Sequence, residues 1–114
     1  MTIMTMHGYF KNHLESVIQT AQNIGSVRIK GYFDGETIFC LEGVHRVEAA
    51  KRLRLPLIID TVSLDDKIYT DCEDVEQDSD GMATVSDLFD YAYGGSLSQV
   101  NIYNDDDFEE VDLR

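Results

Sequence analysis

The residues of this chain best suited to chemistry are Gly43, Val44, His45 and Arg46, which stand between an apolar run and a helical pattern. Where a strand ends in a turn and a helix begins, several main-chain N–H groups lack intrahelical partners and attract anions such as phosphate. His45 and Arg46 add cationic side chains to that first turn, which the helix macrodipole disfavours unless an anion is held nearby. These four residues therefore predict an anion-binding site.

Arg46 in particular requires a negative partner. It shares one helical stripe with Ala49, Ala50 and Leu53 and so heads the inward face of the predicted helix. A partly buried guanidinium group needs an acceptor. The acceptor is a phosphate or carboxylate of a ligand, Glu42 four residues earlier, or an acid from elsewhere in the chain.

A second candidate site is the acidic segment that begins at residue 76. Its spacing comes near the calcium loop of EF-hand proteins, in which oxygen ligands surround the ion and a glycine allows the turn. The candidate metal ligands are Glu76, Asp78, Asp80 and Asp87, with Gly81 at the turn. The first position lacks the usual Asp and the last lacks the bidentate Glu, so the alternative is a solvated acidic loop.

Other side chains that support catalysis or metal binding show no matching spacing. The histidines His7, His13 and His45 form neither H-x-x-x-H nor H-E-x-x-H, so a metal site built on them is not expected. No serine or cysteine stands in a nucleophile motif such as G-x-S-x-G. The sequence therefore names no catalytic residue.

The charge of the chain is unevenly spread. Residues 1–64 carry a net charge of +1 and residues 65–114 a net charge of −14, for a total of −13. Nucleic-acid binders need a basic surface to neutralise phosphates, so direct DNA binding is not expected. The acidic excess either keeps the protein soluble or presents a surface to a basic partner.

Length and composition fit a small protein of the cytoplasm. A chain of 114 residues suits one domain. No apolar run is long enough to span a membrane, and the first residues do not resemble a signal peptide. Cys40 and Cys72 match no zinc or redox spacing, so we expect two free thiols.

The first half of the chain predicts a mixed α/β sheet of the α+β class, with flanking helices. Residues 9–24 have apolar positions at helical spacing, and Gly25 follows as a cap. A hairpin over 27–33 and 37–41 turns at Asp-Gly. A helix over 44–54 and an apolar strand over 57–62 complete the pattern.

The second half is less regular. Residues 67–75 allow a short helix, residues 85–93 predict a helix, and residues 100–103 alternate like an edge strand. We expect one domain over residues 1–103. The acidic tail, 104–114, is either disordered or an acidic-aromatic segment that docks on something.

The order of these elements resembles the ParB/sulfiredoxin superfamily over residues 9–64. The resemblance rests on the hairpin, the segment Glu-Gly-Val-His-Arg at 42–46, the pair Ala49-Ala50 and the apolar strand after Pro56. It implies a small ParB/sulfiredoxin-like sheet and a turn that contacts the phosphates of ATP, CTP or a similar nucleotide. By resemblance, Gly43, His45 and Arg46 make the phosphate contacts.

The chain also departs from that superfamily. Val44 stands where sulfiredoxins have the reactive Cys, and Glu42 where the serine kinases of the superfamily have Asp. The acidic residues after position 64 resemble neither the helix-turn-helix nor the dimerisation region of ParB proteins. Sulfiredoxin chemistry is therefore not expected.

Two functions follow from these observations. In the first, the protein is an acidic nucleic-acid mimic that occupies the basic nucleic-acid-binding surface of a partner, as phage and mobile-element inhibitors of restriction or CRISPR machinery do in a bacterial or phage-infected cell. Its partner-binding residues are Asp105, Asp106, Asp107, Phe108, Glu109, Glu110 and Asp112. In the second, it is a nucleotide-dependent enzyme or switch with ATP or CTP at residues 43–46 and with Mg²⁺ or Ca²⁺. The extreme charge and the missing catalytic partners favour the first.

Overall fold

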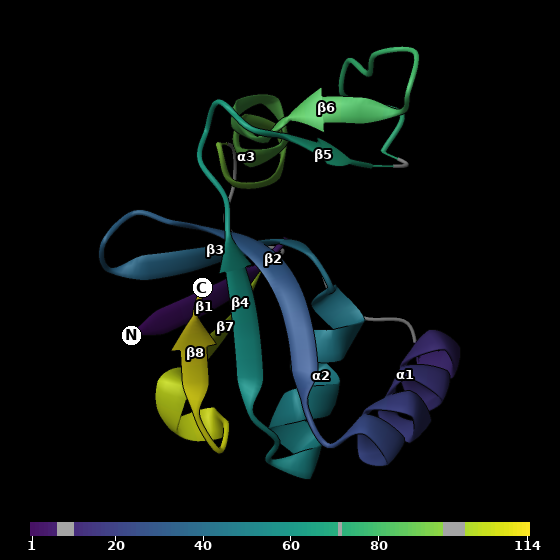
Figure 1. Cartoon of the computed structure of the whole chain (residues 1–114), viewed down its shortest axis with the longest axis vertical. Helices are drawn as coiled ribbons and strands as arrows, with labels where there is room; N and C mark the ends of the chain where they lie inside the picture. The colour runs from purple at the N-terminus through teal and green to yellow at the C-terminus, as the bar shows by residue number, and fades with distance from the viewer. Residues whose placement is uncertain (7–10, 71, 95–99) are drawn as a thin grey trace.

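A computed structural model describes residues 1–6, 11–70, 72–94 and 100–114 (Figure 1). The main sheet consists of β1 (Thr2–Thr5), β2 (Val27–Phe33), β3 (Thr37–Glu42), β4 (Leu57–Thr61), β7 (Asn101–Asn104) and β8 (Val111–Leu113). A second sheet pairs β5 (Lys67–Tyr69) with β6 (Met82–Thr84). The helices are α1 (Lys11–Ile24), α2 (Val44–Leu53), α3 (Val85–Tyr93) and the short 3-10 helix η2 (Asp105–Asp107). The fold is α+β, as the sequence predicts.

The main sheet is mixed, with the strand order β7-β1-β3-β2-β4-β8. β2 and β3 form the predicted antiparallel hairpin, whereas β1 runs parallel to β3 and β4 runs parallel to both β2 and β8. In the hairpin turn, an Asp34 carboxylate oxygen accepts hydrogen bonds from the N–H groups of Glu36 and Thr37, and Gly35 has a φ of 104°. β7 lies at one edge of the sheet, which confirms the edge strand predicted there.

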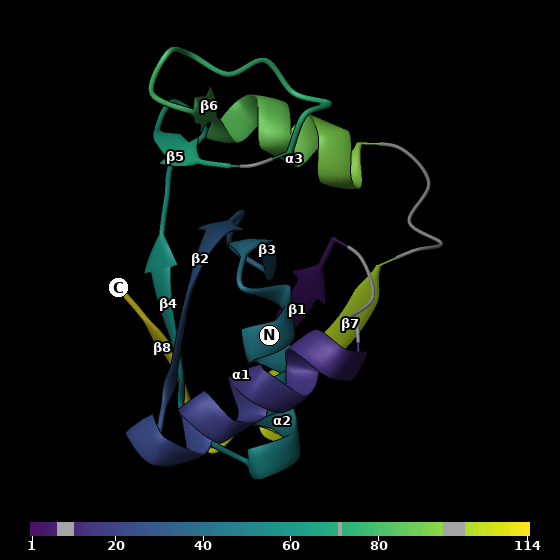
Figure 2. The ribbon, with the colours of Figure 1, turned by 90° about the vertical axis from the view of Figure 1, so that its right-hand side faces the viewer.

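Two apolar cores lie on opposite faces of this sheet, because successive side chains of a strand point to opposite sides. In β3, Ile38 and Cys40 belong to the core shared with α1 and α2, whereas Phe39 and Leu41 contact the core shared with α3, β5 and β6. Figures 1 and 2 show α3, β5 and β6 together at one end of the molecule, away from α1 and α2. The main sheet therefore has α1 and α2 on one side and α3, β5 and β6 on the other.

Three of the predicted helices are confirmed by the elements observed. α1 begins at Lys11, so the first two residues of the predicted helix, 9 and 10, lie outside the described residues. At its end, the N–H of Gly25 donates to the carbonyl oxygen of Ala21. α2 and α3 match the helices predicted over 44–54 and 85–93, and the Thr84 side chain caps α3 by accepting from the N–H of Asp87.

The helix predicted over 67–75 is wrong. Residues 67–69 form the strand β5, and Ile68 lies opposite Ala83 of β6. Ile68 and Val75 are buried and Cys72 is half-buried, so the residues at helical spacing do reach an apolar core, but from a strand and the loop after it. The short strands β1, β6 and β8 have no counterpart among the predicted elements.

The alternative of a disordered tail over 104–114 is also wrong. β8 pairs with β4 in parallel, and the N–H of Leu57 donates to the carbonyl oxygen of Glu110. The Phe108 side chain is 2% exposed and packs beside Tyr103, with ring centroids 6.0 Å apart. The tail docks on the protein's own sheet because its apolar side chains complete the core there.

No helix in the described part of the chain combines the length and the apolar character needed to cross a lipid bilayer.

Candidate anion-binding site

The turn that opens α2 depends on Gly43. Its φ of 109° is strained for any residue with a side chain, and a Cβ at this position would lie 2.6 Å from Cγ2 of Ile29. The carbonyl oxygen of Gly43 accepts the first helical hydrogen bond, from the N–H of Val47. Among the described residues, Gly43 gives α2 no side-chain cap and the first turn contains no acid. The positive end of α2 therefore has no compensating carboxylate within its own first turn.

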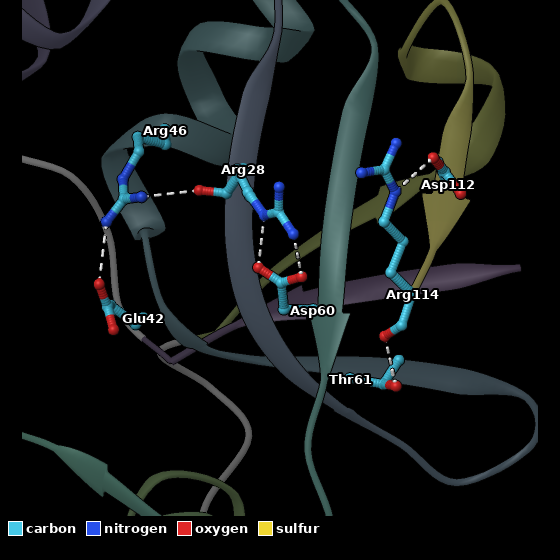
Figure 3. Close-up of polar contacts among 7 residues, drawn as sticks. All are labelled: Arg28, Glu42, Arg46, Asp60, Thr61, Asp112 and Arg114. Atoms are coloured by element: carbon cyan, nitrogen blue, oxygen red, sulfur yellow. Dashed lines mark hydrogen bonds and ion pairs between the residues drawn. The ribbon is translucent and has the colours of Figure 1, made fainter.

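Arg46 is held by two acceptors (Figure 3). One guanidinium nitrogen lies 3.1 Å from Oε1 of Glu42, and another donates a 2.7 Å hydrogen bond to the main-chain oxygen of Arg28. The side chains of Arg46 and Glu42 are each 43% exposed. Of the predicted acceptors, Glu42 is the one found, and the partly buried Arg46 side chain lines the cavity.

Arg28 is fixed in turn by β4. Its guanidinium group makes a two-pronged contact with the Asp60 carboxylate, with distances of 2.6 and 2.7 Å (Figure 3). Hydrogen bonding to Arg28 lowers the pKa of Asp60, and the same contact raises the pKa of Arg28. Both groups therefore stay charged across the physiological pH range, which steadies the strand whose carbonyl group holds Arg46.

A cavity of about 470 Å³ opens at this turn. All four predicted residues, 43–46, line it, and so does His13 of α1. The rings of His13 and His45 meet edge to face, with centroids 4.3 Å apart. The structure thus brings together a second histidine, 32 positions earlier in the sequence, with the predicted anion-binding residues.

Further lining residues of the cavity come from β5, from the segment after it and from α3. They include Tyr69, Cys72, Leu88 and Tyr91. Tyr69 and Tyr91 are 64% and 52% exposed. The Tyr91 hydroxyl donates a 2.6 Å hydrogen bond to the Asp74 carboxylate, and this contact raises the pKa of Tyr91 to about 12. The cavity lining therefore combines the cationic or titratable side chains of His13, His45 and Arg46 with the aromatic rings of Tyr69 and Tyr91.

Comparison with known proteins finds no relative of this chain. No protein-family model, curated protein or solved structure matches this chain. The site is therefore interpreted from its own residues.

The acidic segment predicted to bind calcium forms a smaller hollow of about 190 Å³. Glu76, Asp78 and Asp87 line it together with Lys67, whereas Asp80 does not. The Lys67 ammonium group lies 3.2 Å from the Asp78 carboxylate, which also accepts from two main-chain N–H groups, and these contacts lower the pKa of Asp78. Lys67 is thus paired with one of the candidate ligands, and no group of three metal-ligating side chains is found among the described residues.

The predicted partner-binding residues differ in their exposure to solvent. Asp105, Asp106, Glu109 and Glu110 are exposed, and Asp107 and Asp112 are half-buried. Phe108 is buried in the core, so its assignment to partner contact is corrected: a side chain that fills the core cannot also anchor a second protein. At the C-terminal end of β8, the Arg114 side chain donates to the Asp112 carboxylate, and the main-chain oxygen of Arg114 accepts from the Thr61 hydroxyl (Figure 3).

Sequence reasoning missed His13, Tyr69 and Tyr91 as cavity residues. His13 lies one helical turn before Val17, which also lines the cavity, but a helical pattern alone does not say which other helix it meets. Tyr69 and Tyr91 reach the cavity only because β5 and α3 pack across the end of the sheet. The helix predicted over 67–75 would have directed Tyr69 elsewhere.

Proposed function

We propose that this protein binds a small phosphate-bearing ligand of the nucleotide class in the cavity at the start of α2. One observation carries the proposal: a single cavity is lined by all four residues that the sequence marks for anion binding and by a second histidine from another helix. Its volume of about 470 Å³ falls in the range of small-molecule sites.

The charges in the cavity support this function. The N-terminus of α2 contributes a partial positive charge, and the Arg46 side chain is accessible from the cavity. Arg46 is paired with Glu42. A phosphate group, with a higher charge than one carboxylate, competes for the same guanidinium nitrogens.

The aromatic lining residues favour a nucleotide over inorganic phosphate. The exposed rings of Tyr69 and Tyr91 offer flat surfaces in the same cavity as the turn, and stacking on such rings is how proteins commonly hold a base. The resemblance of residues 42–46 to the phosphate turn of the ParB/sulfiredoxin superfamily points to the same ligand class.

Calorimetric titration tests this function. ATP, CTP and ADP are titrated into the protein with and without Mg²⁺, and at least one should bind. Arg46→Ala should weaken binding at least tenfold, because it removes a charged phosphate contact. Lys51→Ala removes one positive charge from an exposed position of the same helix and serves as the matched control. Absence of binding with all three nucleotides, or equal loss in the two variants, would refute the proposal.

The exposed acids of the tail favour a second candidate function, the occupation of a basic nucleic-acid-binding surface on a partner protein. Asp105, Asp106, Glu109 and Glu110 stand on an ordered segment, so their carboxylates are presented in fixed positions. Complex formation of this kind is fast and strongly salt-dependent. The test compares capture of a partner at low salt by the native protein and by a variant with these four acids changed to amides, and equal capture would refute it.

A further inference from the structure

We infer that His13 and His45 form a shared proton-binding pair, so that a doubly negative ligand enters the cavity together with a proton. This inference rests on the proposed function and adds a linkage that the anion-binding turn alone does not have. The pair joins two helices, since His13 belongs to α1 and His45 to the first turn of α2, and both side chains line the same cavity.

The positive charge of Arg46 is already paired within the site. Arg46 is paired with Glu42 at 3.1 Å, so these two side chains together carry no net charge. A dianion such as a phosphate monoester then needs about two further positive charges to be neutralised on binding, and the N-terminus of α2 supplies part of them. The side chains lining the cavity that can gain positive charge are the two imidazoles.

The imidazole rings of His13 and His45 lie close together. With centroids 4.3 Å apart, two positive imidazolium groups repel each other. A dianion in the cavity attracts both charges and offsets this repulsion. Ligand and proton therefore favour each other, and the coupling is reciprocal.

Among the described residues that line the cavity, the other ionisable side chains belong to types that ordinarily keep their charge in the pH range where imidazole titrates. The remaining titratable or charged side chains that line the cavity are Glu42, Arg46, Tyr69, Cys72 and Tyr91, the last bonded to Asp74. Among these residue types and histidine, imidazole is the one that ordinarily titrates between about pH 5.5 and 7.5. Proton uptake in this range is therefore a signature of the histidines.

The experiment uses sulfate as the probe, because sulfate remains a dianion throughout this range whereas phosphate itself titrates. Binding is measured by calorimetry at about pH 6 and pH 7.5, in buffers of different ionisation heat, which gives the number of protons taken up. Sulfate should bind at least about threefold more tightly at pH 6 than at pH 7.5, because ligand and proton favour each other, and protons should be taken up.

Three variants separate proton linkage from simple contact. His13→Gln and His45→Gln should each reduce the ratio of affinities at the two pH values toward one. His13→Lys supplies a permanent positive charge at the same place and should raise the affinity at pH 7.5, so that the pH dependence becomes weaker than in the native protein. A merely structural role for His13 does not predict this rescue.

The outcomes also distinguish this inference from the proposed function. Sulfate binding that is equal at both pH values, or that keeps its pH dependence in both glutamine variants, overturns the proton linkage and leaves the phosphate site intact. Absence of binding by sulfate and by the nucleotides at both pH values overturns the proposed function, and the linkage with it.

Discussion

The hydroxyl group of Tyr93 lies 2.6 Å from the main-chain oxygen of Cys40 and makes the contact between α3 and the central strand β3. The main-chain oxygen of Met4 in β1 lies 3.1 Å away from the same hydroxyl. Burial raises the pKa of Tyr93, so the phenol stays protonated and remains a donor. Because α3 also supplies Leu88 and Tyr91 to the cavity, this bond holds one cavity wall against the sheet.

Tyr93→Phe should lower the free energy of unfolding by about 1–2 kcal/mol, because the buried main-chain oxygen of Cys40 loses its phenol donor. Urea denaturation measures the change. Tyr69→Phe is the control, since Tyr69 is 64% exposed and its substitution should leave stability nearly unchanged. Equal effects of the two substitutions would contradict this role of Tyr93.

The stability of the protein should fall as the pH rises above about 9. Burial raises the pKa of the Cys40 thiol from 9.0 to about 12, so the thiol is neutral in the folded state while it ionises in the unfolded chain. The unfolded state therefore releases a proton, and its stability relative to the folded state increases between these two values. The slope of unfolding free energy against pH between about 8.5 and 10 measures this effect.

Cys40→Ala provides the matched test of that slope. The substitution lowers stability at every pH because it leaves a small cavity, but it should flatten the pH dependence just above pH 9. A slope that is unchanged in Cys40→Ala would show that another group is responsible.

Thr5→Val should stabilise the protein by about 1 kcal/mol. Thr5 is fully buried in β1, and within the described part of the chain its Oγ1 has no hydrogen-bond partner. Valine has nearly the same shape and no hydroxyl group to desolvate. Thermal and urea denaturation measure the gain, and a loss of stability would indicate that the hydroxyl has a partner in solution.

Phe108→Ala should destabilise the protein by about 3–5 kcal/mol, as expected for a buried aromatic side chain that leaves a cavity. Its neighbour two positions on, Glu110, is exposed, and Glu110→Gln should change stability by less than about 0.5 kcal/mol. Chemical denaturation of the two variants distinguishes a tail that belongs to the core from one that only carries charge.

Much of the first half of the fold could be predicted from sequence because its signals are local. The Asp-Gly turn, the glycine cap after α1 and the alternation in β2 and β3 each depend on residues close in the sequence. The Arg46–Glu42 pair is also local, because four positions separate the two residues across the turn at Gly43. The candidate anion-binding segment, residues 43–46, can be named from the sequence for the same reason.

The remaining elements depend on contacts that local patterns do not contain. Strands of three or four residues, such as β1, β6 and β8, hold too few side chains for a period to be recognised. The spacing of Ile68, Cys72 and Val75 suits a helix, yet pairing of Ile68 with the β6 strand decides the structure. Likewise, His13 and His45 meet only because α1 packs on α2.

The position of β7 and β8 has a consequence for the synthesis of the chain. These strands flank the sheet at its two opposite edges, although only residues 105–110 separate them in sequence. Until residues 101–113 have left the ribosome, β1 and β4 each present an unpaired edge on which another nascent chain can pair. β1 and β4 are thus covered in one step, which leaves the short strands β7 and β8 as the edges of the sheet, and chaperone binding before that step should protect β1 and β4 together.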